Sequence, residues 1–201
     1  SKLASAGVLS PAIVTCLQFS YQTPLNREAP APNFEPRIRG IFTGTFFLKT
    51  ILSSSKRVES LLNATKATTP LQAGGIRNGT ESIAAFAQAA HNNGGVVLTT
   101  DDANAFNRLD RSHILDTVRE RAASSFNIIN TFYCPPAPTA ISWNEEAEGG
   151  GARRRFTIAY SSQGSRQGCT LGGVLYNLGK DPLYQELAAE FVESLVLKAH
   201  T

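Results

Sequence analysis

Two adjacent carboxylates, Asp101 and Asp102, follow a short apolar run at positions 96–100 that is rich in β-branched residues. This run follows Gly94 and Gly95, and its composition predicts a short buried strand. An acid at the end of such a strand suits a metal ligand, because the strand fixes the carboxylate while the next loop opens to solvent. Strand side chains alternate between faces, so we expect at most one of the two acids in such a site. A helix cap or a turn is the alternative role for either acid.

A glycine-rich segment further along the chain holds the second set of candidate residues. Residues 161–173 contain four glycines in thirteen positions, and Gln167 stands directly before one of them, Gly168. Glycine allows the backbone to approach a ligand closely. A flexible connection between two elements is the alternative interpretation of this segment.

The two segments together resemble the first and second palm motifs of reverse transcriptases. Residues 101–107 read DDANAFN, an acid with an aromatic residue five positions later, and residues 163–173 read QGSRQGCTLGG. Upstream, residues 71–81 read LQAGGIRNGTE, which is similar to the stretch before the palm in retrotransposon-type enzymes. Residues 36–39, PRIR, stand where these enzymes carry an Arg-Pro-Ile-like finger strand. The resemblance covers about residues 36–190.

This resemblance implies an RNA-directed DNA polymerase, in which two divalent ions held by palm carboxylates serve phosphoryl transfer. It makes Asp101 a catalytic residue and a ligand of Mg²⁺. It places Phe106 beneath the incoming sugar, where a bulky ring excludes a 2′-hydroxyl and selects deoxynucleotides. A viral RNA-copying polymerase, which tends to have a small polar or acidic residue there, is therefore the less favoured alternative. Gln167 and Gly168 would contact the templating base and the incoming nucleotide.

The partner implied by the resemblance is RNA or a template-primer. Arg37 and Arg39, and also Arg77, are candidates for neutralising the triphosphate or backbone phosphates. For each arginine taken alone, a solvated surface position is the alternative, just as a core position is the alternative for Phe106. The sequence departs from the family after the Gln-Gly pair at 167–168. Cys-Thr follows there instead of the common Asp-Pro, which weakens the expected contact with the template.

A third palm motif, with two adjacent acids on a hairpin, is not found after Gly173, where the sequence reads as one apolar helical stretch. A single carboxylate cannot organise two metal ions, so we expect residues 1–201 alone not to polymerise. Two interpretations remain open. The chain is a part of a longer reverse transcriptase, which the absence of any methionine fits, or it is a structural or RNA-binding subunit of a larger assembly.

The elements expected around these residues predict an α+β fold, with helices covering a small antiparallel sheet. The resemblance implies that this fold is the fingers and an incomplete palm of a polymerase. We expect a Pro-rich N-terminal arm at residues 1–35, a fingers-like segment at 36–95 and a partial palm at 96–201. Within them the patterns predict a strand near 38–42, helices within 46–62, 78–91, 110–118 and 126–132, hairpin arms at 141–143 and 156–160, and a helical tail interrupted near 181–182.

Three local signals refine these elements. Asn78, with Glu81 three residues later, predicts a capping box. Asp110 or Ser112 is expected to cap the next helix. The basic run at 153–155 faces acids at 145–148 across the expected hairpin, and such a pairing needs no outside partner.

The composition bounds the function classes. The 201 residues are 42% hydrophobic and 17% charged with a net charge of +3, which neither requires nor excludes nucleic acid. Apolar runs are far shorter than the roughly 20 residues of a membrane span, so we expect no membrane insertion. Three widely spaced cysteines argue against a disulfide framework and predict an intracellular, reducing compartment. Three scattered histidines give no basis for a Ser-His-Asp site.

Overall fold

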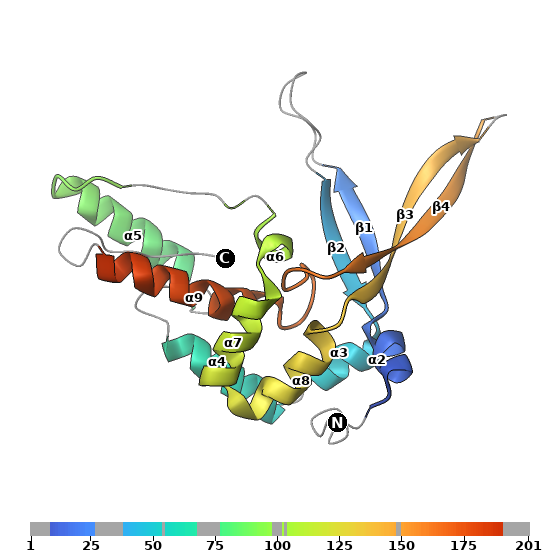
Figure 1. The fold of residues 1–201 in the computed structure, drawn as a ribbon. Helices are drawn as coiled ribbons and strands as arrows, with labels where there is room; N and C mark the ends of the chain where they lie inside the picture. The colour runs from blue at the N-terminus through green and yellow to red at the C-terminus, as the bar shows by residue number, and fades with distance from the viewer. Residues whose placement is uncertain are drawn as a thin grey trace.

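The computed structural model describes residues 9–26, 38–53, 55–67, 77–97, 102, 104–147 and 150–190. This part of the chain has an α+β fold with eight helices and a four-stranded mixed sheet (Figure 1). None of the helices described in these ranges is long and apolar enough to cross a membrane.

The helices and strands alternate irregularly along the chain. The helices are α2 (Pro11–Gln18), α3 (Phe46–Leu52), α4 (Ser55–Ala67), α5 (Gly79–Asn92), α6 (Ala105–Arg108), α7 (Arg111–Arg121), α8 (Ala123–Tyr133) and α9 (Gly172–Glu190). The strands are β1 (Ser20–Asn26), β2 (Ile38–Gly44), β3 (Ala137–Ala147) and β4 (Gly151–Ser161).

The sheet consists of two antiparallel pairs joined side by side, in the order β2-β1-β3-β4. The joint between β1 and β3 is parallel, with Ser20 opposite Thr139. The hydroxyls of these two residues lie 3.0 Å apart in a buried hydrogen bond. The expected antiparallel sheet is therefore corrected to a mixed one, because a strand from the N-terminal segment pairs along its length with β2 and over three residues with β3.

The described N-terminal residues form helix α2 and strand β1. Ser10 caps α2 by accepting from the amide of Ile13, and Pro11 stands at the first helical position, where a missing N–H costs nothing. Pro24 lies in β1 beyond the three residues that pair with β3, so it leaves no gap in that ladder. Residues 11–26 thus contain a helix and a strand within the expected N-terminal arm, and the division of the chain into arm, fingers-like and palm segments stays a prediction.

Most of the predicted helices and the hairpin are confirmed. Asp110 caps α7 by accepting from the amide of Ser112 at 2.8 Å. The interruption expected near Pro182 is wrong, because α9 runs through it. Gln185 donates to Asp181 at 2.7 Å, a contact that spans the turn containing the proline.

Two local expectations fail before α6. Asn78 precedes α5 in the left-handed conformation, with φ of 59° and no side-chain cap, so the capping box is wrong. Val96 is 98% exposed and Val97 is 42% exposed, so these two residues do not belong to a buried strand. Residues 98–100, the rest of that expected strand, lie outside the described residues.

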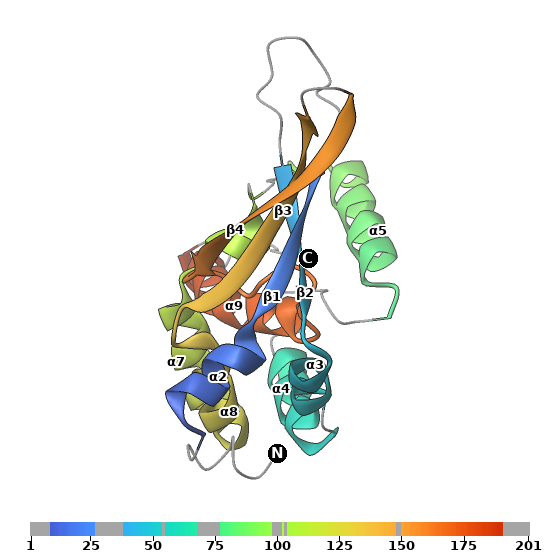
Figure 2. The same cartoon turned by 90° about the vertical axis from the view of Figure 1, so that its right-hand side faces the viewer.

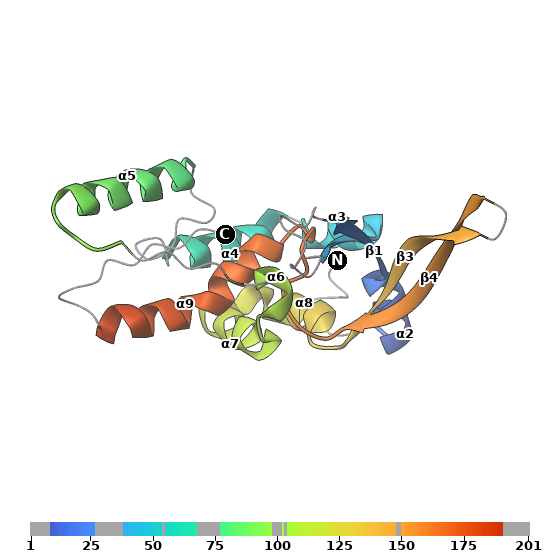
Figure 3. The same ribbon diagram turned by 90° about the horizontal axis from the view of Figure 1, so that it is seen from above.

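The core lies where α4, α7, α8 and α9 pack together at one end of the sheet (Figure 2). Its fully buried members include Leu61, Ile114, Ile129, Phe132 and Leu175. Each such side chain contributes roughly 1.5–3 kcal/mol on burial. The hairpin β3–β4 extends away from this helical layer (Figure 3). The core thus anchors one end of the sheet and the loop that follows β4.

Candidate functional site

The loop between β4 and α9 lies against the segment that contains α6. The amide of Gly164 donates to the carbonyl of Leu109 at 2.8 Å, and the amide of Ser165 donates to the carbonyl of Phe106 at 2.6 Å. These bonds join the two segments that the sequence analysis singled out, although more than fifty residues separate them along the chain.

Gly164 makes this close approach possible. Its φ is +70°, and a Cβ at this position would lie 2.1 Å from the carbonyl oxygen of Phe106. Both the backbone conformation and the missing side chain are therefore required here. No backbone shift of a few tenths of an ångström would admit a larger residue.

The same loop also contacts strand β2. The amide of Phe42 donates to the carbonyl of Gln167 at 2.8 Å, and the amide of Gln167 lies 3.4 Å from the side-chain oxygen of Asn107, to which it donates. Gly168 has a φ of +94°, and a Cβ there would lie 2.5 Å from the carbonyl oxygen of Phe42. The structure therefore brings Phe106, Gln167 and Gly168 together at one place.

The side chain of Arg111 is hydrogen-bonded to the loop between β4 and α9. It is 5% exposed and makes five hydrogen bonds of 2.9–3.2 Å. They reach the carbonyls of Tyr133, Ser161, Gln163 and Gly164 and the hydroxyl of Ser161. Burial, assisted by the nearby charge of Arg166, lowers the pKa of Arg111 to about 10, so it remains a cation at neutral pH.

Tyr133 supports the loop from the core. Its hydroxyl donates to the carbonyl of Ser165 at 3.1 Å and lies 2.8 Å from the sulfur of Cys169. The guanidinium of Arg166 lies over its ring, 5.0 Å from the centroid. Burial raises the pKa of Tyr133 well above its usual value, so the hydroxyl keeps its proton. The loop is therefore supported by fixed groups on α7 and α8.

Asp102 is tied to helix α9. Its Oδ2 accepts from the hydroxyl of Tyr176 at 2.8 Å and pairs with the ammonium of Lys180 at 2.8 Å. The bond from Lys180, followed by that from Tyr176, lowers the pKa of the Asp102 carboxyl. The half-buried ring of Phe106 packs on the ring of Tyr176, with centroids 5.0 Å apart. Helix α9 thus contacts two residues of the segment at 101–107, the carboxylate of Asp102 and the ring of Phe106.

The expected Mg²⁺ ligand, Asp101, lies outside the described residues. Within the part of the chain that is described, no group of three His, Cys, Asp or Glu side chains could hold a metal ion. The Oδ2 oxygen of Asp102 is already bound to Lys180 and Tyr176.

Among the contacts described for the loop after β4, none involves a predicted arginine. Arg37 lies outside the described residues, and Arg39 is a residue of strand β2. Arg77 is exposed in the turn before α5, and the three ribbon views show α5 apart from the loop after β4 (Figures 1 to 3). A phosphate-binding role for Arg37, Arg39 and Arg77 stays a prediction.

The basic run on β4 is paired across the hairpin as expected. Arg155 forms an ion pair with Glu145 at 2.7 Å, and Arg154 donates to the hydroxyl of Ser142 at 3.1 Å. Both charges of the ion pair are about half exposed, with side-chain values of 49% and 52%. Such pairs contribute at most about 1 kcal/mol, so the run remains available to solvent.

One face of the sheet carries exposed apolar side chains, and we call it the aromatic face. Its large members are Tyr21 (60% exposed), Ile41 (36%), Phe156 (73%), Ile158 (45%) and Tyr160 (68%). The pairing register places them together: Ile158 and Tyr21 both lie opposite Ala140, and Thr43, two residues from Ile41, lies opposite Tyr21. Strand alternation puts Arg154 on the same face as Phe156.

Sequence reasoning missed the groups that hold the loop, namely Asn107, Arg111, Tyr133 and Arg166, and those that hold Asp102, namely Tyr176 and Lys180. One of them carried a local signal. Arg111 stands in the first turn of α7, where the helix dipole disfavours a cation, so another role was indicated. Tyr176 and Lys180 are spaced i and i+4, which puts both on one side of α9 but does not identify Asp102 as their partner.

No family model matches the chain, and no curated protein matches it either.

Proposed function

We propose that this chain provides the fingers and part of the palm of a retrotransposon-type reverse transcriptase and that it binds a template-primer. The observation that carries the proposal is the hydrogen-bonded contact between residues 104–109 and residues 163–168, with β2 on the other side of the loop. In the resembling enzymes these are the segments that form the nucleotide site. Their association in the fold is what such a site requires.

The residues of this contact have distinct roles in the proposal. Phe106, backed by Tyr176, supports the sugar of an incoming deoxynucleotide. The backbone of Gln167 is bound to Phe42 and Asn107, which fixes the position from which its side chain contacts a base. Gly168 is exposed and presents bare backbone beside it. Asp101 remains the proposed catalytic carboxylate, with Mg²⁺ as the ion that would supply charge stabilisation there.

The aromatic face supplies a surface for the nucleic acid itself. Exposed aromatic rings stack on bases regardless of sequence, and nearby arginines attract the phosphate backbone. Phe156 and Tyr160 lie on the same face of β4, on either side of Ile158, and Arg154 lies on that face two residues before Phe156. A soluble domain rarely exposes so many large apolar groups on one sheet face without a partner.

Binding of a fluorescent RNA–DNA template-primer to residues 1–201 tests the proposal. We expect salt-sensitive binding, weakened about tenfold or more by the double variant Phe156→Ala/Tyr160→Ala, because each stacked base contributes about 1–3 kcal/mol. Phe47→Ala is the matched control, since Phe47 is 68% exposed but lies on α3 rather than on the aromatic face. Equal binding by the double variant and the control would contradict this use of the face.

We also expect residues 1–201 with Mg²⁺, template-primer and deoxynucleotides to give no primer extension. One candidate carboxylate cannot hold two ions, and the sequence after Gly173 offers no acidic doublet. Extension assayed on a denaturing gel is the measurement. Extension that disappears in Asp101→Ala would show that these residues suffice for catalysis and would overturn the expectation.

A non-catalytic RNA-binding subunit is the second candidate, favoured by the aromatic face, which binds without any metal. The two functions differ in their response to nucleotide. A polymerase site binds the template-primer more tightly when the complementary deoxynucleotide is added, whereas a stacking platform alone is indifferent to it. The same titration, repeated with and without the matching deoxynucleotide, therefore distinguishes them.

A further inference from the structure

Two guanidinium groups are buried beside the loop without a carboxylate. Arg111 is 5% exposed and Arg166 is 4% exposed, and neither belongs to an ion pair in the described part of the chain. The buried acid Asp181 is paired with Arg121 instead. Buried charges in proteins are normally paired, so this pair of cations lacks a counter-charge among the described residues.

Arg166 has an unused donor. Its Nη2 donates to the carbonyl of Phe132 at 2.9 Å, but its buried Nε has no hydrogen-bond partner. The same carbonyl also accepts from Gln18 at 2.9 Å, so both of its lone pairs are occupied and it cannot accept a further bond. A buried charged donor without a partner is costly, and a bound ion or water is the usual explanation.

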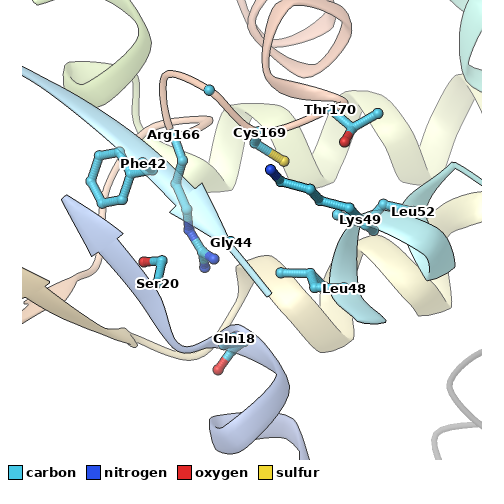
Figure 4. A pocket seen from close by; sticks show the side chains of 11 residues that line it. Gln18, Ser20, Phe42, Gly44, Leu48, Lys49, Leu52, Arg166, Cys169 and Thr170 are labelled. Atoms are coloured by element: carbon cyan, nitrogen blue, oxygen red, sulfur yellow. The ribbon is translucent and has the colours of Figure 1, made fainter. Parts of the chain in front are cut away.

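A pocket adjoins this guanidinium. It lies between β2, α3 and the loop after β4, and its empty volume, including the open mouth, is about 360 Å³ (Figure 4). Arg166 and Lys49 both line it, while Phe42, Leu48 and Leu52 form apolar wall. The lining includes no Asp or Glu. Arg166 and Lys49 therefore line one pocket whose lining residues include no acid.

We propose that this pocket binds a phosphate group, either inorganic phosphate or the phosphate of a nucleoside monophosphate. Arginine and lysine are the cations that proteins use to bind phosphate oxygens. A phosphate dianion would compensate the positive charges of Arg166 and Lys49. The pocket is separate from the aromatic face, because Phe42 and Ile41 are adjacent on β2 and alternate between its two sides. The site is therefore distinct from the aromatic face, while Gly168 of the proposed nucleotide contact also lines this pocket.

Cys169 provides a direct readout, because it lines the pocket and is partly exposed. The chain is treated with N-ethylmaleimide at constant ionic strength, with phosphate replacing chloride, and the rate at each cysteine is followed by mass spectrometry. We expect phosphate to slow alkylation of Cys169 severalfold and to leave the exposed thiols of Cys16 and Cys134 unchanged. Equal rates at Cys169 with and without phosphate would overturn the proposal, as would equal slowing at all three.

Lys49→Gln tests the second cation without touching the core, since Lys49 is exposed. The variant should raise the phosphate concentration needed for protection about fivefold, the effect of one partly exposed charge pair. Arg119→Gln is the control, because Arg119 lies on α7 with a 61% exposed side chain and does not line the pocket. Equal protection in wild type and Lys49→Gln would overturn the assignment. Adenosine monophosphate protecting at lower concentration than phosphate would identify the nucleotide as the source.

Discussion

Replacing Arg111 with lysine is expected to lower the free energy of unfolding by about 3 kcal/mol or more. A single ammonium carries three donors at one point and cannot reach the four carbonyls and one hydroxyl that the planar guanidinium serves. Buried carbonyls would lose their partners, and each unsatisfied group costs about 1–3 kcal/mol. For a chain of this size the midpoint of thermal unfolding should fall by roughly 10 °C.

Arg119→Lys is the matched control for this variant. It lies on the same helix, pairs with Asp116 and lies over the ring of Phe126, 4.5 Å from its centroid. Its side chain is 61% exposed and lysine keeps the charge, so its loss should be within about 1 kcal/mol. Burial lowers the pKa of Arg111 from 12.5 to about 10. Between pH 6 and 8 the folded and unfolded states both keep this proton, so the contribution of Arg111 to the stability of the wild type should not vary with pH there. Similar losses in the two variants would show that Arg111 does not hold the loop.

The parts of the fold that could be predicted from the sequence are those with a strong local pattern. The spacing of apolar residues predicts α5, α7 and α8, and Asp110 marks the start of α7. The alternation of Phe156, Ile158 and Tyr160 predicts the hairpin. Such features depend on neighbours a few residues away, which the sequence contains in full.

The failures depend on distant partners. The prolines of the N-terminal arm do not reveal its elements, since Pro11 stands at a helix start and Pro24 in a strand whose partners are β2 and β3. The run at 96–100 has the composition of a buried strand, yet Val96 is exposed because no neighbouring element covers it in the described fold. Local propensity cannot decide which element will lie alongside.

The candidate site divides in the same way. Phe106, Gln167 and Gly168 were identified because their segments resemble known motifs, and the structure brings them together. The groups that hold them there, such as Arg111 and Tyr133, act over separations of 22 to 53 residues. Their contacts could not be read from spacing alone.

Gly164→Ala should be among the most damaging single-methyl substitutions in the described part of the chain. An added Cβ would lie 2.1 Å from the carbonyl oxygen of Phe106, and the φ of +70° strains any L side chain. The loop must move away, which breaks the 2.6 Å bond from Ser165 to Phe106 and the 3.0 Å bond from Arg111 to the carbonyl of Gly164. We expect a loss of roughly 3–4 kcal/mol in urea unfolding.

Gly173→Ala separates this steric effect from the general effect of adding a methyl group. A Cβ at Gly173 meets nothing within 4 Å, and the residue lies in α9, where alanine is favoured over glycine by up to about 1 kcal/mol. It should therefore be neutral or stabilising. Hydrogen exchange adds a local readout, since the Ser165 amide should lose protection in Gly164→Ala only. Because the same bonds join the two motif-like segments, Gly164→Ala should also weaken template-primer binding; a variant that unfolds more easily yet binds equally would separate the contact from the proposed function.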